Sequence, residues 1–193
     1  MTTSGRIELM APAGNFESMQ AALDNGCDSI YFGVEQLNMR ARATVNFVLD
    51  DLPEIARRCN EKNVRTYLTL NTIIYDHDLS IVKTLLTKAK EAGITAVIAS
   101  DQAVIMTART MGMEVHISTQ LNVTNIETVK FYAMFADTIV LSRELSLRQV
   151  KKITEDIEKE QVKGPSGNLV EIEIFGHGAL CMAVSGKCYL SLH

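Results

Sequence analysis

Two cysteines and a histidine stand close together near the end of the sequence, in a stretch rich in glycine. His177 comes first, Cys181 and Cys188 follow, and six residues separate the two cysteines. Zinc ribbons and thioredoxin motifs place their cysteines about two residues apart, and a structural zinc ion or an iron–sulfur cluster takes about four ligands. The pair therefore either holds a metal together with ligands beyond residue 193 or binds no metal. Without a metal, Cys181 beside His177 could act as a thiolate nucleophile activated by an imidazole.

The other two cysteines are expected to be packing residues. Cys27 and Cys59 stand alone among apolar neighbours, and free cysteine behaves as a small buried hydrophobe. Cys59 falls inside a predicted helix, and Cys27 precedes the second predicted strand, at the opposite end of the domain from Cys181. Neither is expected to complete a metal site with the later pair.

Polar residues follow several of the apolar runs, at the points where parallel strands would end. Gln120, Arg143 and His177 do not sit where a helix cap is needed, and we expect them to be catalytic. Asn71 follows the third predicted strand and is expected to bind substrate. The carboxyl ends of parallel barrel strands meet at one face, where barrel enzymes place their chemistry. These side chains should therefore converge.

A pair of arginines follows the second predicted strand. Arg40 and Arg42 could clamp a carboxylate or phosphate through paired N–H donors; their spacing fits solvated surface charges equally well. We expect them to bind substrate and, together with Arg143, to hold a small ligand with carboxylate groups, such as a dicarboxylate.

Strand and helix patterns alternate along the whole chain. Short β-branched or aromatic runs occupy residues 7–11, 29–33, 64–71, 96–100, 114–120, 138–142 and 171–177. Amphipathic segments of helical period lie between them, at residues 16–25, 52–62, 79–92, 102–111, 125–135 and 145–160. Strand starts recur about every 27 residues, the length of a strand–helix unit. Parallel strands joined by right-handed crossovers follow from this order.

Residues at the boundaries support the predicted helices. Gly93 and Gly112 can end the third and fourth helices, and Ser146 can begin the last. Asp101 and Ser142 precede helices, and we expect them to serve as caps more than as site residues.

Two architectures are compatible with this alternation, an open doubly wound sheet and a closed barrel. The segment after the first strand, residues 11–15, has one glycine and lacks a dinucleotide-binding fingerprint. A barrel has eight strands and about 250 residues. The prediction is therefore an incomplete (β/α)8 TIM-like barrel with about seven parallel strands, its eighth strand missing. Residues 1–193 would form one truncated N-terminal barrel domain, without its closing strand and C-terminal region.

The composition is that of an ordinary globular domain. Of the 193 residues, 47% are hydrophobic and 22% charged, and the net charge of −4 argues against a chain that coats nucleic acid non-specifically. No apolar run approaches the ~20 residues of a membrane helix, and the first residues lack a secretory signal. We therefore expect a cytoplasmic protein without disulfides that does not associate with membranes.

The stretch around the two cysteines resembles peptidase family U32, the collagenase-like peptidases. The positions that match the family pattern are Glu173, Phe175, Gly178, Ala179, Leu180, Cys181, Gly186, Cys188, Leu190 and Ser191. Residues 9–15, 28–33 and 141–146 are also similar to segments of the family. The resemblance therefore extends over essentially the whole chain.

The resemblance implies two different activities. Some members of the family are described as collagenases or proteases. Others use prephenate to hydroxylate uridine or cytidine in RNA, or hydroxylate a ubiquinone precursor, and contain iron–sulfur clusters. Residues 142–146 and 177–183 look closest to the branch that makes 5-hydroxyuridine in tRNA. Cys181 and Cys188 would then be two of four ligands of a cluster of the 4Fe–4S type, with prephenate as co-substrate and tRNA as partner.

Three functions remain open at this point: a tRNA-hydroxylating enzyme, a peptidase, and a non-catalytic subunit that carries a cluster or positions RNA. The chain has neither the His-Glu-x-x-His helix of zinc proteases nor a Gly-x-Ser-x-Gly elbow. Two cysteines in one glycine-rich turn are more easily explained as cluster ligands than as a nucleophile and a bystander. This favours the hydroxylation hypothesis.

Overall fold

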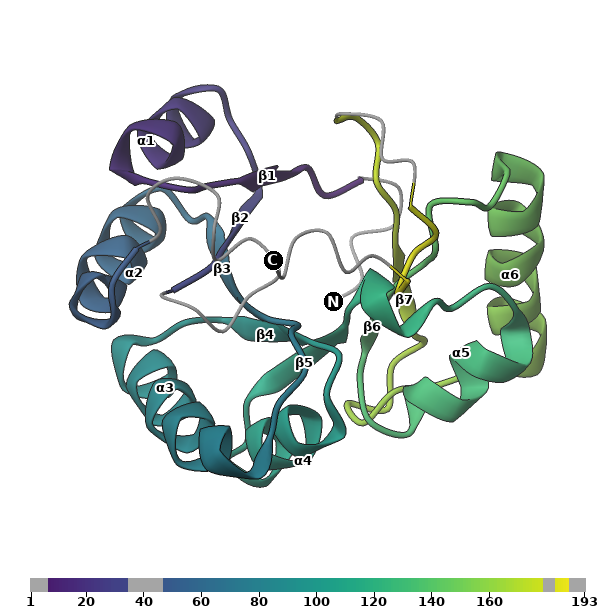
Figure 1. The fold of residues 1–193 in the computed structure, drawn as a ribbon. Helices are drawn as coiled ribbons and strands as arrows, with labels where there is room; N and C mark the ends of the chain where they lie inside the picture. The colour runs from purple at the N-terminus through teal and green to yellow at the C-terminus, as the bar shows by residue number, and fades with distance from the viewer. Residues whose placement is uncertain (1–6, 35–46, 179–182, 188–193) are drawn as a thin grey trace.

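The computed structural model describes residues 7–34, 47–178 and 183–187. Within them, seven parallel strands form one sheet in which every strand pairs with its neighbours in sequence. The strands are β1 (Met10–Pro12), β2 (Ser29–Phe32), β3 (Arg65–Leu70), β4 (Ala96–Ala99), β5 (Glu114–Ile117), β6 (Thr138–Val140) and β7 (Glu171–Glu173). The sheet curls, with the helices outside it (Figure 1). The predicted incomplete barrel of seven parallel strands is confirmed.

Among the described residues, six α-helices connect the strands, as the alternation predicted. They are α1 (Phe16–Asp24), α2 (Leu52–Glu61), α3 (Leu79–Ala92), α4 (Gln102–Thr110), α5 (Ile126–Ala133) and α6 (Leu147–Glu160). No helix among the described residues is long and apolar enough to cross a membrane.

The helix boundaries follow local hydrogen bonding. Asp101 caps α4, because its side chain accepts the Ala103 N–H at 2.8 Å. Ser146 caps α6 and forms a reciprocal capping box with Gln149. Gly93 ends α3 with φ of +82°, in the left-handed region that glycine adopts without strain. The predicted roles of Asp101, Ser146 and Gly93 are confirmed.

Several strands are shorter than predicted. β5 stops at Ile117 instead of residue 120, because the Ser118 side chain accepts the Gln120 N–H and turns the chain into the 3₁₀ helix η3 (Thr119–Leu121). β7 stops at Glu173 instead of residue 177. As β1 and β7 are the ends of the described sheet, each pairs on one side only, and their ladders are correspondingly short.

The main hydrophobic core lies between the sheet and the helices. Outward-facing side chains such as Ile30, Leu68 and Ile117 pack there and are fully buried. Cys27 and Cys59 belong to the same core, and both are free thiols, as predicted. Burial raises the pKa of the Cys59 thiol to about 11, so this thiol is neutral at physiological pH.

The inner face of the sheet, in contrast, carries charged side chains near β1 and β3. The Tyr67 hydroxyl donates to Glu8 Oε1 at 2.7 Å, and the Arg65 guanidinium pairs with the same carboxylate. Arg65 also lies over the Tyr67 ring, 5.4 Å from its centroid. Burial tends to raise the pKa of Glu8, but these hydrogen bonds and the Arg65 charge outweigh it, and the pKa is lowered. The Glu8 carboxylate is therefore held ionised.

A histidine continues this charged layer across β5 to β7. The His116 side chain is almost fully buried; its Nε2 lies 3.1 Å from Glu114 Oε1 and its Nδ1 lies 3.8 Å from Glu173 Oε2. Its ring packs against Tyr67, with centroids 4.5 Å apart. Burial alone would lower the pKa of His116, but the two carboxylates outweigh it and the pKa is raised. The two carboxylates therefore favour the protonated form of His116 over the neutral one.

The raised pKa of His116 makes the stability of the fold depend on pH. The folded state holds this proton more tightly than the unfolded chain, whose histidine pKa is about 6.5. The contribution is therefore fully present below about pH 6.5 and is lost as the pH rises through the folded-state pKa. His116→Gln should flatten the fall in unfolding free energy above pH 6.5, measured by urea denaturation. His77→Gln, at an exposed histidine, should leave the slope unchanged; equal slopes for all three proteins would contradict the prediction.

Candidate functional site

The segment 183–187, which lies between the two cysteines in sequence, is docked on the turn that follows β6. Ser185 is buried, with 1% of its surface exposed. Its backbone N–H donates to Glu144 Oε1 at 2.7 Å, and its hydroxyl oxygen accepts from the Arg143 backbone N–H at 3.3 Å and from Arg143 Nε at 3.4 Å. These contacts attach the middle of the cysteine stretch to the carboxyl end of a barrel strand.

Arg143 donates hydrogen bonds to the segment, whereas Glu144 accepts one from it. Arg143 Nη2 donates to the Ala183 carbonyl at 3.2 Å, whereas Glu144 accepts from Ser185. Partial burial tends to raise the pKa of Glu144, but the hydrogen bonds from Ser185 outweigh it and the pKa is lowered. Glu144 therefore acts as an ionised acceptor at neutral pH, which strengthens its bond to the backbone N–H.

The turn after β5 supports the segment from another side. Thr119 Oγ1 lies within 3.4 Å of Ser185 Oγ. Gly186 lies against the Gln120 backbone, and a Cβ at residue 186 would overlap the Gln120 carbonyl oxygen. Gly186 also has φ of +73°, which L residues with a side chain rarely adopt. Glycine is therefore required at residue 186 for two independent reasons.

A second group of polar side chains lies at the same strand ends. Asn71 Nδ2 donates to Ser118 Oγ at 3.3 Å, and Ser118 Oγ also accepts the Gln120 backbone N–H. Asn71 and the Gln120 turn are thus brought together, as predicted from their positions after β3 and β5. Ser142 does not cap a helix, contrary to expectation: its hydroxyl donates to Asn122 Oδ1 at 2.6 Å, and Ser146 takes the cap.

The other predicted site residues are placed less closely. His177 is exposed, four residues beyond the end of β7, and no hydrogen bond joins it to Asn71, Gln120 or Arg143 in the part of the chain that the structure describes. The predicted ligand-binding arginines and cluster thiols lie outside the described residues. These are Arg40, Arg42, Cys181 and Cys188.

Sequence reasoning missed three residues that this arrangement uses. Ser185, Glu144 and Thr119 were given no role, although Ser185 lies between the cysteines and Glu144 lies in the 142–146 run. Their positions could have identified them. Thr119 is next to Gln120, Glu144 is next to Arg143, and Ser185 lies between the two cysteines in the sequence.

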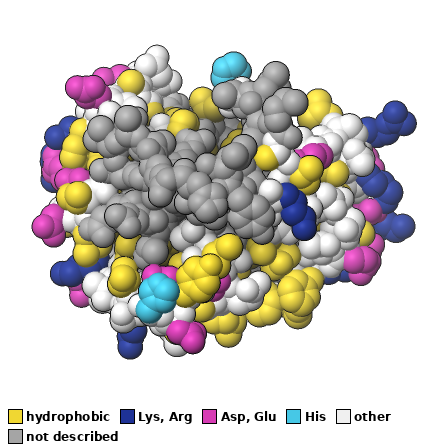
Figure 2. All heavy atoms as spheres, viewed as in Figure 1, with side chains coloured by type: hydrophobic (Ala, Val, Ile, Leu, Met, Phe, Trp, Pro, Cys, Tyr) yellow, Lys and Arg dark blue, Asp and Glu magenta, His cyan; other side chains and the backbone are white. Residues whose placement is uncertain are grey.

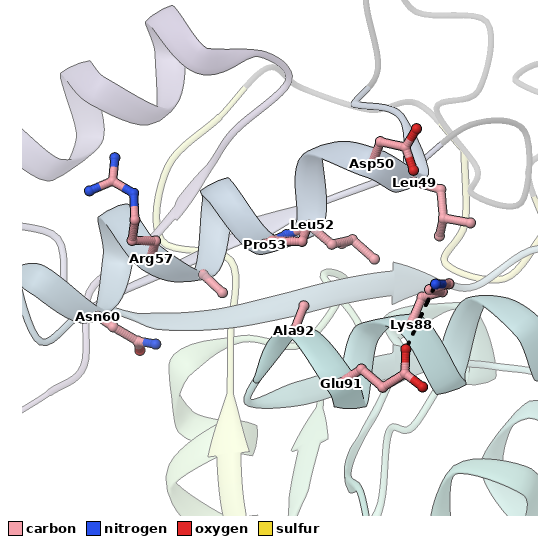
Figure 3. Close-up of a pocket in the computed structure, with 10 residues that line it drawn as sticks. Leu49, Asp50, Leu52, Pro53, Arg57, Asn60, Lys88, Glu91 and Ala92 are labelled. Carbon is pink, nitrogen blue, oxygen red and sulfur yellow. Dashed lines mark ion pairs between the residues drawn. The ribbon is translucent and has the colours of Figure 1, made fainter.

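A cavity of about 420 Å³ lies elsewhere, between α2 and α3 on the outer helical layer (Figure 3). Its charged lining residues include Arg57, Lys88 and Glu91, and Lys88 pairs with Glu91 at 3.8 Å. Arg57 also forms ion pairs, with Glu54 and Glu61 on its own helix. None of the strand-end residues lines this cavity, so it is separate from the candidate site.

No group of three or more His, Cys, Asp or Glu side chains within residues 7–34, 47–178 and 183–187 is arranged to hold a metal ion. Figure 2 shows basic and acidic side chains mixed at the left and right edges of this face. The described contacts hold the backbone of residues 183–187 against the turns that follow β5 and β6.

Comparison with known proteins supplies the family. The model of peptidase family U32 matches residues 14–193. The chain belongs to peptidase family U32. This U32 chain is 54% identical to the "Collagenase" of Porphyromonas gingivalis over 187 residues, which cover 97% of the chain and 45% of that relative. It is 31% identical to the "tRNA hydroxylation protein P1" of Bacillus subtilis over 189 residues, which cover 96% of the chain and 42% of that relative.

Relatives under both functional names thus match nearly the whole U32 chain, and the chain spans less than half of their length. The solved structure of the U32 peptidase Mk0906 has a TM-score of 0.65 at 14% identity, and the match covers 90% of this chain and 70% of that one. This likeness supports the barrel fold.

The Gly186 contact gives a direct test of the docked segment. Gly186→Ala should displace residues 183–187, because the added methyl group would meet the Gln120 carbonyl and the positive φ would be strained, at a cost of about 1–3 kcal/mol. Trypsin should then cleave after the exposed Lys187 at least several times faster, which peptide mass spectrometry can follow.

Gly176→Ala is the matched control. No described atom lies within 4 Å of where its Cβ would stand, so cleavage after Lys187 should keep the parent rate. Equal rates for Gly186→Ala and the parent would show that residues 183–187 are not held as described.

Proposed function

We propose that this U32 chain carries the cluster-binding part of an enzyme that hydroxylates uridine in tRNA, in the cytoplasm, with prephenate as co-substrate. One observation carries the proposal: the backbone between Cys181 and Cys188 is clamped at the carboxyl ends of the barrel strands through Ser185. A nucleophilic thiol needs a base and an orienting group, whereas a pair of cluster ligands needs a fixed separation. The relative named as a tRNA hydroxylation protein supports the same reaction class.

We propose an iron–sulfur cluster of the 4Fe–4S type as the cofactor, with Cys181 and Cys188 as two of its ligands. Because residue 186 is glycine, no side chain covers the backbone at this point. Backbone N–H groups can donate to cluster sulfurs. Cys27 and Cys59 are buried in the outer core and do not supply the other ligands. We propose that the remaining two ligands lie beyond residue 193. When bound, the cluster would supply electron-transfer chemistry.

The remaining predicted residues would then act on the substrates. Arg40 and Arg42 would bind the carboxylates of prephenate, since guanidinium groups pair with carboxylates through two N–H donors. The side chains of Asn71 and Gln120 would orient a substrate by hydrogen bonding; the Asn71 side chain and the Gln120 backbone N–H both donate to Ser118 Oγ. His177, an exposed imidazole, would be the third of these side chains.

Iron content tests the cofactor. In the natural full-length protein, reconstituted anaerobically with iron and sulfide, Cys181→Ala and Cys188→Ala should each lose most of the iron, the sulfide and the broad visible absorption, because a cluster with a missing thiolate is released readily. Cys27→Ala is the control, and it should retain the parent's iron because Cys27 lies in the core. Full iron in both of the first two variants would contradict the assignment and make Cys181 a candidate nucleophile beside His177.

Ligand affinity tests the arginines. Arg42→Ala should weaken prephenate binding by about 2–5 kcal/mol, the usual loss for a buried charge-assisted contact, measured by calorimetry on the full-length protein. Arg148→Ala, at an exposed arginine of α6, should bind as the parent does. An unchanged affinity in Arg42→Ala would remove this arginine from the site.

A collagenase-like peptidase is the second candidate, and the 54% identity with a relative named "Collagenase" favours it. Hydrolysis of gelatin that survives removal of iron by a chelator and is lost in Cys181→Ala would support the peptidase. Hydroxylation of tRNA that requires both iron and prephenate would support the enzyme proposed above. Binding of tRNA with neither activity would indicate a non-catalytic subunit.

A further inference from the structure

We infer that Tyr75 and His77 form an aromatic ledge on which an unpaired base of single-stranded RNA stacks, close to the uridine that the enzyme modifies. The inference rests on the proposed function in one respect, that RNA is the substrate. It adds the feature of the RNA that the chain recognises, which is the flat face of a neighbouring base.

The two rings of the ledge are parallel and open to solvent. Their planes differ by 3° and their centroids lie 5.7 Å apart, the displaced arrangement that aromatic pairs favour. Tyr75 is 61% exposed, and the side chain of His77 is 80% exposed. A third flat ring can therefore be added to the pair in the same orientation.

The loop that carries the rings is held by its own hydrogen bonding. Asp78 Oδ2 accepts the Tyr75 backbone N–H at 3.0 Å, and Asp78 Oδ1 lies 3.6 Å from His77 Nε2. Residues Asp76–Asp78 form the 3₁₀ helix η2, which leads directly into α3. The ledge is thus ordered before a ligand arrives, which lowers the entropy cost of binding.

Apolar side chains beside the rings are exposed as well. Ile73 is 50% exposed and Leu79 is 44% exposed. Ile74, in contrast, packs against the hydrophobic core, so the segment has an inner and an outer side. Exposed apolar groups gathered in one segment mark interaction sites on soluble proteins. A base laid on the ledge would remove apolar surface from water, which is favourable.

The ledge lies at the same face of the barrel as the candidate site. Residues 71–78 connect β3 to α3, so they stand at the carboxyl ends of the strands (Figure 1). Asn71, which is expected to orient the substrate, begins this connection. From Asn71 to Tyr75 the chain spans at most about 14 Å, the rise of about four stacked bases. A base on Tyr75 would therefore be a near neighbour of the modified uridine.

The charges near the ledge favour stacking over phosphate binding. Asp76 and Asp78 flank His77 in sequence, and the whole chain has a net charge of −4. Both features disfavour contacts with the phosphates of RNA. Stacking needs no basic surface, because every base has an aromatic face. Enzymes that modify a base act on single strands or take the base out of the helix, and unstacked bases bind aromatic side chains.

Binding of a short RNA to the natural full-length protein tests the ledge. The probe is a fluorescein-labelled single strand with a central uridine between adenosines, followed by fluorescence anisotropy. Tyr75→Ala should weaken binding about 5- to 150-fold, the loss expected for one base stacked on an aromatic ring. His77→Ala should weaken it about 2- to 12-fold, the contribution of an aromatic pair.

Conservative and matched variants separate stacking from other effects. Tyr75→Phe keeps the ring and should bind as the parent does, whereas Tyr75→Leu keeps apolar bulk without a ring and should bind as weakly as Tyr75→Ala. Phe131→Ala is the matched control, because Phe131 is a 53% exposed aromatic residue on α5, in the outer helical layer. Its affinity should equal that of the parent.

Salt and RNA structure provide two further controls. The ratio of the parent affinity to that of Tyr75→Ala should persist when the salt concentration is raised, because stacking releases no counterions. A double-stranded RNA of the same sequence should not distinguish the two proteins, because its bases are already stacked on one another.

The outcomes separate the ledge from the proposed function. Parent-like binding of the single strand by Tyr75→Ala or by Tyr75→Leu would overturn the ledge and leave the RNA substrate intact. A parent protein that binds no single-stranded RNA would overturn the RNA substrate itself. Weaker binding of a gelatin peptide by Tyr75→Ala, together with unchanged binding of RNA, would overturn the inference in favour of a peptide on the ledge.

Discussion

The charged layer inside the sheet is the constraint on which the rest of the structure depends. A charge removed from water must meet a partner, or its burial destabilises the fold. The buried His116 on β5 lies between Glu114 and Glu173, which is on β7, and the more exposed Arg65 on β3 pairs with Glu8, which precedes β1. These contacts join alternate strands, the relation that produces the side-chain layers of a barrel interior. A flat sheet would separate these groups, so their pairing favours the curl.

The curl in turn decides which loops can meet. Because each strand pairs with its neighbour in sequence, the carboxyl ends of β5 and β6 stand side by side, and the turns that follow them can grip one segment from two directions. Ser185 occupies that point, with Thr119 on one side and Arg143 and Glu144 on the other. The side chains on the inner face of the sheet favour the curl, and the turns at the carboxyl ends of the strands hold residues 183–187.

The alternation of strands and helices was predictable from the sequence, because it depends on the local spacing of hydrophobic residues and on capping residues such as Asp101 and Ser146. The short length of β7 was not predictable from the sequence, because a strand with one neighbour ends where that neighbour ends. The convergence of Asn71 with the Gln120 turn followed from strand order. The hydroxyl of Ser142, in contrast, bonds to a side chain from the turn after β5, a contact that depends on packing between loops.

The need for glycine at residue 186 also depends on packing between loops. The sequence therefore shows that a glycine stands there but not why it is required. A family pattern marks the position, yet the reason for it is a tertiary contact: the Gln120 carbonyl occupies the space that a Cβ would need. Flexibility alone would have been satisfied by a glycine at several neighbouring positions. A close approach combined with a positive φ fixes one position only, and it does so through a residue more than sixty positions earlier in the chain. The position of this glycine is therefore a property of the barrel rim, against which residues 183–187 must fit.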